Sequence, residues 1–240
     1  EEEGWPTPSG KQELFSETMI EFGYPKHAIP HYKVRSHVHP ENLQGDDEYC
    51  LLPNFRLPQH IHSRSANAKW LAEIGHRNPL WVHPTDAKKL GVGEGDLLKV
   101  ETEIGWFIDK VWVTEGIKPG IIGCSHHIGR WRRKQDAGNR YMTNEVEIED
   151  LGDGKMRMRT TSGVRPWKSN DPDTNRVWWR DGGVHQNITH AVQPDPISGA
   201  HCWLQKVRIT KPKEGERYGD VEVDTNKSFE YYKKWNEMAK

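Results

Sequence analysis

The sequence has few cysteines and no long apolar segment. Its 240 residues include only three cysteines, Cys50, Cys124 and Cys202, which are far apart and form no CxxC pair. An odd number of widely spaced cysteines argues against a disulfide framework and favours reduced thiols. No window holds the roughly 18 apolar residues that a membrane-spanning helix needs, and the acidic, proline-rich start "EEEGWPTPSG" shows no signal-peptide pattern.

An excess of charge of one sign is also missing. The chain carries 34 Lys and Arg against 35 Asp and Glu, which gives a formal net charge of -1. Such a balance provides no general attraction to nucleic acid or to an anionic membrane surface. We therefore expect no nucleic-acid partner.

Glycine, proline and tryptophan are abundant. The chain contains 22 Gly, 15 Pro and 11 Trp, while 34% of its residues are hydrophobic. Many turn-forming residues beside many large aromatic side chains indicate a loop-rich fold with short strands. The length allows one large domain or two small ones, with a sizeable core.

Residues 46–131 show the most regular pattern. We expect a strand within residues 48–57 and short helices over residues 65–75 and 83–91. The second helix has Thr85 or Asp86 near its first turn and Gly91 as its C-cap. Residues 93–124 then alternate apolar runs with glycine-containing turns, which predicts a strand, turn, strand, turn, strand sequence.

The two ends of the chain differ from this middle part. Residues 1–45 are expected to form an irregular arm, with one short helix that ends at Gly23 because three prolines follow. Residues 185–212 return to an ordered pattern and end in the strand "WLQKVRIT". The tail, residues 213–240, is expected to finish in a helix that docks through Phe229, Tyr232 and Trp235.

Residues 132–184 are polar and rich in turn-forming residues, and we interpret them as an insertion. One hairpin is expected around "LGDGK". Trp167, Trp178 and Trp179 are costly to leave in water. We therefore expect the insertion to be ordered by packing against the main body, although a disordered loop is the alternative.

Four segments resemble a known family. They are "TPSGKQELFSE", "NPLWVHPTDAKKLGVGEGDLLKVETEIGWF", "VTEGIKPGII" and "SHHIGRW". In this order and spacing they are similar to the C-terminal part of the large subunits of the molybdopterin oxidoreductases, the DMSO reductase family. The resemblance implies a mainly β fold, a six-stranded double-psi β-barrel over residues 46–131 and 185–212, which binds molybdopterin guanine dinucleotide.

The resemblance also implies an activity and partners. The cofactor would carry Mo or W and support two-electron chemistry, either oxygen-atom transfer or hydroxylation, with a sulfur or arsenic compound as a candidate substrate. The family's Cys-rich cluster motif and its metal-ligating residue have no counterpart in this sequence, so other segments would ligate the metal. Expected partners are the rest of the catalytic large subunit, an iron–sulfur subunit and a membrane anchor subunit, and we expect no activity from this chain alone.

Two other functions remain open. The chain could keep the barrel without the cofactor, as a structural subunit of a membrane-associated electron-transfer complex. It could also be a free-standing metalloenzyme that uses its 13 histidines. Metal and pterin analysis would separate these from the first interpretation.

The segment "HIHSRSAN", residues 60–67, is the first candidate site. Arg and Ser side by side suit a pyrophosphate, because Arg forms a planar fork to phosphate oxygens and Ser adds a neutral donor. The resemblance assigns cofactor contacts to His60, His62, Ser63, Arg64, Ser65 and Asn67. Alternatively, Asn67 caps the following helix and Arg64 lies on the surface.

The segment "CSHHIGRW" is the second candidate. The resemblance places it alongside the pterin and gives as cofactor contacts Ser125, His126, His127, Arg130 and Trp131. A continuing strand would put Ser125 and His127 on one face and His126 on the other. Since a metal site needs three or four convergent ligands, we predict no metal site here, with structural polar residues as the alternative.

The third candidate lies within residues 183–206. Asn187 and Asp195 stand where the family reads the guanine edge or ribose, and an amide and a carboxylate have suitable donors and acceptors. Alternatively, Asp195 and Pro196 begin a turn. Lys206 could balance a phosphate or be an ordinary charge on a strand surface, and no residue of the chain is predicted to be catalytic.

Overall fold

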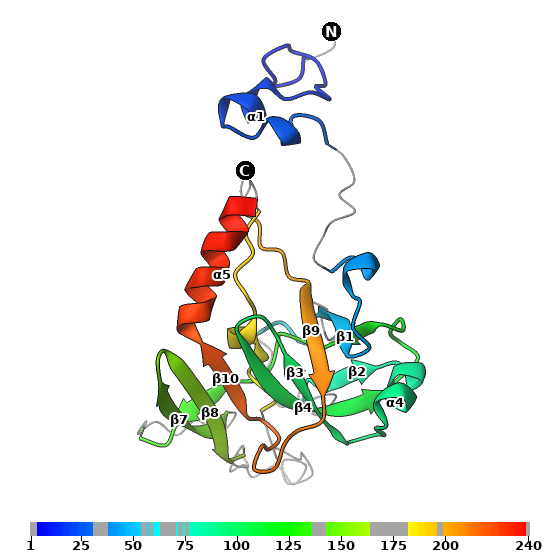
Figure 1. Cartoon of the computed structure of the whole chain (residues 1–240), viewed down its shortest axis with the longest axis vertical. Helices are drawn as coiled ribbons and strands as arrows, with labels where there is room; N and C mark the ends of the chain where they lie inside the picture. Colours follow the sequence, from blue (N-terminus) through cyan, green and yellow to red (C-terminus); the bar gives the residue numbers. More distant parts are fainter. Residues whose placement is uncertain are drawn as a thin grey trace.

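Ten strands form one hydrogen-bonded sheet, and six of them close into a barrel (Figure 1). The computed structural model describes residues 4–30, 38–53, 57, 60–62, 71, 74, 77–135, 143–163, 182–195 and 199–238. The barrel order is β2-β5-β1-β9-β3-β4, and a β2–β4 pairing closes it. The six strands are β1 (Glu48–Leu52), β2 (Leu80–Val82), β3 (Leu97–Glu101), β4 (Gly105–Val113), β5 (Ile121–Gly123) and β9 (Gln205–Thr210). The predicted mainly β fold with a six-stranded barrel is confirmed.

Strands that follow one another in the chain do not always pair with each other in the barrel. β3 and β4 form an antiparallel hairpin, with Leu98 opposite Asp109. β5 instead pairs in parallel with β1, where Cys50 lies opposite Ile121. β1 also pairs antiparallel with β9, where Glu48 lies opposite Arg208. The predicted strands therefore occur, but only the first of the two predicted turns makes a hairpin.

The barrel interior is filled by apolar side chains from every strand. Residues that point inward alternate with residues that point outward along each strand. The fully buried members of this core include Leu51, Leu80, Leu98, Val100, Phe107 and Ile122. Each such burial contributes about 1.5–3 kcal/mol, so these side chains are a principal source of the barrel's stability.

Helix α4 (Pro84–Leu90) connects β2 to the turn before β3. Its N-cap is His83, whose ring Nδ1 accepts from the backbone N–H of Thr85 at 3.2 Å. The helix ends at Gly91, which has a φ of 65° and is the C-cap that the sequence predicts. Asp86 accepts from the backbone N–H of Gly120 at 2.8 Å, so the helix is tied to the segment that leads into β5.

Four more strands continue the sheet beyond β4, in the order β10-β8-β7-β6. They are β10 (Val221–Asp224), β8 (Lys155–Ser162), β7 (Asn144–Gly152) and β6 (Trp131–Arg133). β7 and β8 form the hairpin that the sequence predicts around "LGDGK", with Asp153 at a φ of 51° in the turn. Trp167, Trp178 and Trp179 lie outside the described residues.

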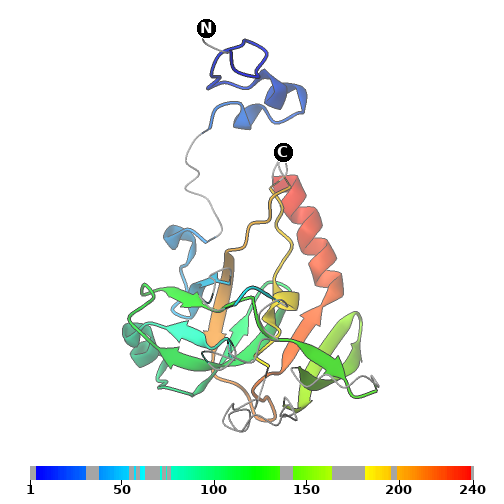
Figure 2. The same cartoon turned by 180° about the vertical axis from the view of Figure 1, so that it is seen from behind.

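The N-terminal segment lies apart from the barrel. Its short elements are α1 (Glu17–Glu21), η1 (Pro25–His27) and, nearer the barrel, η2 (Pro40–Asn42). In both views residues 4–30 stand away from the sheet, beyond the free end of the C-terminal helix (Figures 1 and 2). The helix that the sequence predicts before Gly23 is present, and among the described residues no helix is long and apolar enough to span a membrane.

The C-terminal helix α5 (Thr225–Met238) docks through a different face from the one expected. Phe229 and Tyr232 are 60% and 38% exposed, so the expectation that they dock was wrong. Trp235 instead donates its Nε1–H to the carbonyl of Pro194 at 2.7 Å, and the hydroxyl of Tyr231 accepts from Gln193 at 2.7 Å. Residues four apart share one helix face, so Tyr231 and Trp235 define the docking side.

Candidate functional site

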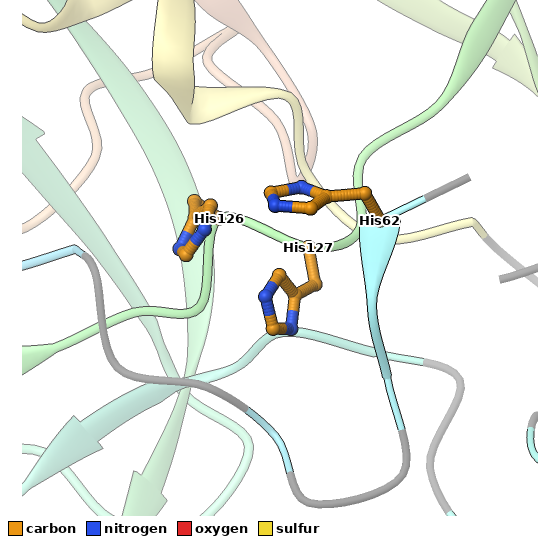
Figure 3. A group of neighbouring side chains, drawn as sticks. All are labelled: His62, His126 and His127. Atoms are coloured by element: carbon orange, nitrogen blue, oxygen red, sulfur yellow. The ribbon is translucent and has the colours of Figure 1, made fainter. Parts of the chain in front are cut away.

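Three histidine rings converge beside the end of β5 (Figure 3). The ring centroids of His62 and His126 are 4.8 Å apart, those of His62 and His127 are 4.7 Å apart, and those of His126 and His127 are 4.4 Å apart. His62 is exposed, His126 is half-buried and His127 is buried. The cluster therefore extends from the surface to the interior.

The convergence of His126 and His127 contradicts the strand geometry expected from the sequence. β5 ends at Gly123, and residues 126 and 127 form a turn. Strand alternation therefore stops before the two histidines, and their rings can point toward the same place. The prediction that only one of them could face a given site was wrong for this reason.

The "HIHSRSAN" segment contributes one member of the cluster among its described residues. His60 is only 2% exposed and lies inside the protein, whereas His62 is exposed and joins the cluster. His62 has a φ of 44°, an uncommon backbone conformation for a non-glycine residue. The predicted contacts Ser63, Arg64, Ser65 and Asn67 lie outside the described residues.

The orientation of His126 is fixed by neighbours from two other segments. Its Nδ1 lies 3.1 Å from the carbonyl oxygen of Pro53, and because a carbonyl can only accept, Nδ1 carries the proton. Its backbone carbonyl accepts from the side-chain amide of Asn187, in η4 (Gln186–Thr189), at 3.2 Å. The ring also lies 5.6 Å from the ring of Trp203, so an exposed aromatic surface borders the cluster.

Ser125 supports the loop from beneath. It is fully buried, and its hydroxyl accepts from the backbone N–H of His127 at 3.3 Å. Its carbonyl accepts from the side-chain amides of Gln186 at 2.6 Å and Asn78 at 3.2 Å. Ser125 was expected to face the cofactor, but in this structure its hydroxyl is inaccessible and instead holds the turn of His126 and His127.

Asn78, which the sequence analysis did not single out, links the segments of the site. Its amide nitrogen donates to the carbonyl of Val184 at 2.9 Å, and its amide oxygen accepts from the N–H of Val184 at 2.8 Å. The same nitrogen is 3.1 Å from the side-chain oxygen of Gln186. One buried side chain thus joins the start of β2 to the loop after β5 and to residues 184–186.

The loop and residues 182–185 also approach each other at Gly129. This residue has a φ of 106°, and a Cβ atom there would lie 2.2 Å from the carbonyl oxygen of Val184. Only glycine fits both the backbone conformation and the close approach. The chain directly before Arg130 and Trp131 is therefore held in one position.

Two buried polar groups in this region have no hydrogen-bond partner among the described residues. They are the side-chain oxygen of Asn187 and both ring nitrogens of His190. His190 is 8% exposed, and burial, with smaller effects of His201, His126 and His185, lowers its pKa from 6.5 to about 3. The ring is therefore neutral near pH 7, with one donor and one acceptor nitrogen.

Arg130 and Trp131 follow the loop directly. Arg130 is half-buried, and this burial lowers the pKa of its guanidinium from 12.5. Trp131 opens β6, is 37% exposed and lies 6.2 Å from the ring of His185 in an edge-to-face arrangement. A cation and an aromatic surface therefore stand next to the histidine cluster along the chain.

Asp195 and Lys206 have contacts with other parts of the chain. Asp195 is exposed, and its backbone N–H donates to the carbonyl of Ala200 at 2.6 Å, while Pro196, with which it could begin a turn, lies outside the described residues. Lys206 forms an ion pair with Glu48 at 2.8 Å and donates to the carbonyl of Asn42 at 3.1 Å. The hydrogen bond from Lys206 is the main reason that the pKa of Glu48 falls to about 2.

Comparisons with known proteins match this part of the chain. A family model described as the molydopterin dinucleotide binding domain matches residues 51–153. The arsenate respiratory reductase molybdopterin-containing subunit of Chrysiogenes arsenatis is 28% identical over 193 residues, which cover 69% of this chain and 22% of that protein. The trimethylamine-N-oxide reductase of Haemophilus influenzae is 30% identical over 200 residues, which cover 80% of this chain and 23% of that protein.

A solved structure agrees on the fold. Acetylene hydratase from Pelobacter acetylenicus superposes with a TM-score of 0.55 at 18% identity, over 88% of this chain and 24% of that one. The chain thus spans less than a quarter of each of these three proteins. The matched domain and these relatives support a molybdopterin dinucleotide binding domain like the C-terminal domain of the molybdopterin oxidoreductases of the DMSO reductase family.

Proposed function

We propose that this chain is the cofactor-binding part, as a domain or a separate subunit, of an oxidoreductase with a molybdenum or tungsten bis-pterin guanine dinucleotide. When bound, the cofactor would supply two-electron chemistry, either oxygen-atom transfer or hydroxylation. The residues of this chain would bind and orient the dinucleotide and keep water from it. Relatives named for arsenate and thiosulfate reduction make a sulfur or arsenic compound our candidate substrate.

The observation that carries the proposal is the pair of unpartnered polar groups at Asn187 and His190. A buried polar group without a hydrogen bond costs about 1–3 kcal/mol. A ligand with N–H and C=O groups along its ring edges, as in a pterin or a guanine, would satisfy both residues. Neutral His190 can donate from one nitrogen and accept at the other, and Asn187 offers an acceptor.

Neighbouring residues suit the rest of such a ligand. Arg130 supplies a cation with a planar set of donors, which matches a phosphate or a ring carbonyl. The exposed rings of Trp131 and Trp203 offer surfaces for stacking against a flat heterocycle. His62, His126 and His127 would line the same region, while Ser125 and Asn78 would hold it in shape.

The proposal also concerns what the chain needs from other segments. The three cysteines of the sequence form no cluster motif, so we propose that iron–sulfur clusters and the metal ligand lie in the rest of the catalytic large subunit. An iron–sulfur subunit would carry electrons, and a membrane anchor subunit is a further proposed partner. Turnover by this chain alone is not expected.

Cofactor content after substitution tests this function. The protein is purified with the chains that accompany it, as wild type and as Asn187→Ala and Arg130→Ala, and pterin dinucleotide, Mo and W are measured. Asn226→Ala is the matched control, because the amide of Asn226 also donates to a backbone carbonyl, that of Asp153, in the turn between β7 and β8. Circular dichroism checks that each variant is folded.

Both site variants are expected to retain less cofactor than the control. For Arg130→Ala, loss of a charge-assisted hydrogen bond costs about 1.5–3 kcal/mol, which corresponds to roughly 10- to 150-fold weaker binding. For Asn187→Ala, loss of a neutral hydrogen bond should have a smaller effect, about 0.5–1.5 kcal/mol. Full pterin occupancy in both variants would refute the assigned contacts. A wild-type protein that never contains pterin would favour the structural subunit instead.

A further inference from the structure

The three clustered histidines have the composition of a metal-ligand set. The nitrogen atoms that could serve as ligands, one from each of His62, His126 and His127, all lie within 4.8 Å of one another. Among the described residues this is the one such group of three or more His, Cys, Asp or Glu side chains. No carboxylate or thiol is part of it, so the set consists of imidazoles alone.

The separation of these nitrogens is close to what one ion requires. Zinc binds histidine nitrogen at about 2.0–2.1 Å in tetrahedral geometry, which puts ligand nitrogens about 3.4 Å apart. Rotation of the exposed His62 side chain toward the other two can supply most of the remaining approach. His126 and His127 are already held together, because the turn that carries them is fixed by Ser125.

The hydrogen bond of His126 prepares it as a ligand. Its Nδ1–H points to the carbonyl of Pro53, so in the neutral ring the lone pair is on Nε2. Metal-bound histidines typically donate their second ring nitrogen to a carbonyl or carboxylate in this manner, which fixes the tautomer and the ring direction. The carbonyl of Pro53 would therefore orient the His126 ring without itself binding the metal.

We propose that His62, His126 and His127 bind one first-row divalent cation, and that zinc is well suited to the site. Three histidines leave a fourth position of a tetrahedral ion for water or an anion. The site uses only residues of this chain. Because the same histidines line the proposed cofactor region, an ion and a pterin would compete for them. Metal affinity is therefore measured without pterin, and pterin content in the assembled protein tests the other proposal.

The cysteines do not belong to this ligand set. Cys50 and Cys124 are buried and Cys202 is half-buried, and none of the three is among the clustered ligand atoms. The ion would therefore be held by imidazoles alone.

Metal titration of the full chain tests the site. The protein is treated with a chelator, returned to about pH 8, above the usual histidine pKa of about 6.5, and titrated with Zn²⁺ in a calorimeter and with Co²⁺ in a spectrophotometer. The variants are His62→Ala and His127→Ala. His83→Asn is the control, because Asn removes an imidazole but retains an N-cap acceptor for α4.

Wild type and His83→Asn are expected to bind one equivalent of Zn²⁺, and their Co²⁺ forms should show tetrahedral d–d bands without thiolate charge transfer. Each site variant should bind Zn²⁺ at least about 100-fold more weakly, since even loss of an outer partner costs 10- to 100-fold. His62 is exposed, so His62→Ala is expected to remain folded. Equal affinity in wild type and His62→Ala, or no binding by wild type, would overturn the proposal.

Discussion

The interior of the barrel and the polar end beside it are both buried, but they are built from opposite kinds of residue. The barrel interior is dominated by apolar side chains such as Leu51, Leu80 and Phe107. The polar end consists of Asn78, residues 124–131 and residues 184–190, where Ser125, Gln186 and His190 are buried. Apolar contacts are non-directional, whereas amide and imidazole contacts need particular partners. A substitution in the barrel should therefore cost stability according to the volume that it removes, whereas a substitution at the polar end should cost stability according to the hydrogen bonds that it breaks.

The largest effect should come from the barrel interior. Phe107→Ala removes a fully buried ring, and we expect it to lower the free energy of unfolding by about 3–5 kcal/mol, because it leaves a cavity. Chemical denaturation followed by circular dichroism measures this. Phe22→Ala, at a side chain that is 67% exposed, is the control and should change stability by less than about 0.5 kcal/mol. Similar losses in the two variants would contradict the assignment of the core.

The second largest loss of stability is expected at the polar end. Asn78→Ala removes one small side chain but leaves both the backbone N–H and the carbonyl of Val184 without the partner that Asn78 provides. We expect a loss of about 3 kcal/mol, at the upper end of the range for an unsatisfied buried group. Asn226→Ala, which removes one exposed hydrogen bond, should cost about 1 kcal/mol or less by the same measurement. If the two asparagines cost the same, the polar end is not held by directional bonds.

The polar end should also respond to pH where the barrel does not. Folding lowers the pKa of His190 from 6.5 to about 3, so between these values the unfolded chain binds more protons. Stability from this residue is fully present above about pH 6.5 and falls by about 1.4 kcal/mol per pH unit as the pH decreases toward 3. Unfolding free energies at pH 6.5 and 5 should therefore differ by about 2 kcal/mol from this cause. The variant His190→Gln should lose less over the same interval, and an unchanged pH slope would contradict the prediction.

The smallest effect concerns the helix that is attached to the polar end. Trp235→Phe removes the hydrogen bond to Pro194 and should reduce stability by about 1 kcal/mol. Phe229→Ser, on the exposed face of α5, should stay within about 0.5 kcal/mol of wild type in thermal or chemical unfolding. A larger loss of stability for Phe229→Ser than for Trp235→Phe would instead support docking through Phe229, as predicted from the sequence.

The barrel could be predicted from sequence because its signals are local. Alternating apolar residues mark β3, β4 and β9, and Gly91 marks the end of α4. β2 has only three residues, Leu80–Val82, which is too short for alternation to be recognised. The family resemblance supplied the closure of the barrel, which no local pattern contains.

The candidate site could be predicted only in part, because its geometry depends on segments far apart in sequence. The loop after β5 was identified from its composition, but the turn at His126 and His127 was not expected, so their convergence with His62 was missed. Asn78 was missed because its partners at residues 125 and 184 lie 47 and 106 positions away. His190 is one of 13 histidines, and its burial has no sequence signature.

The pairing of β1 with β9 has a consequence for how the chain folds. Glu48 lies opposite Arg208, so one side of β1 has no partner until a segment 160 positions later arrives. During synthesis β1 and β3 would both present open edges, and open edges can pair with other chains. Contacts so distant in sequence are associated with slow folding. A chain that stopped before residue 205 would lack the strand that joins β1 to β3, and we would expect it to aggregate rather than to form a smaller barrel.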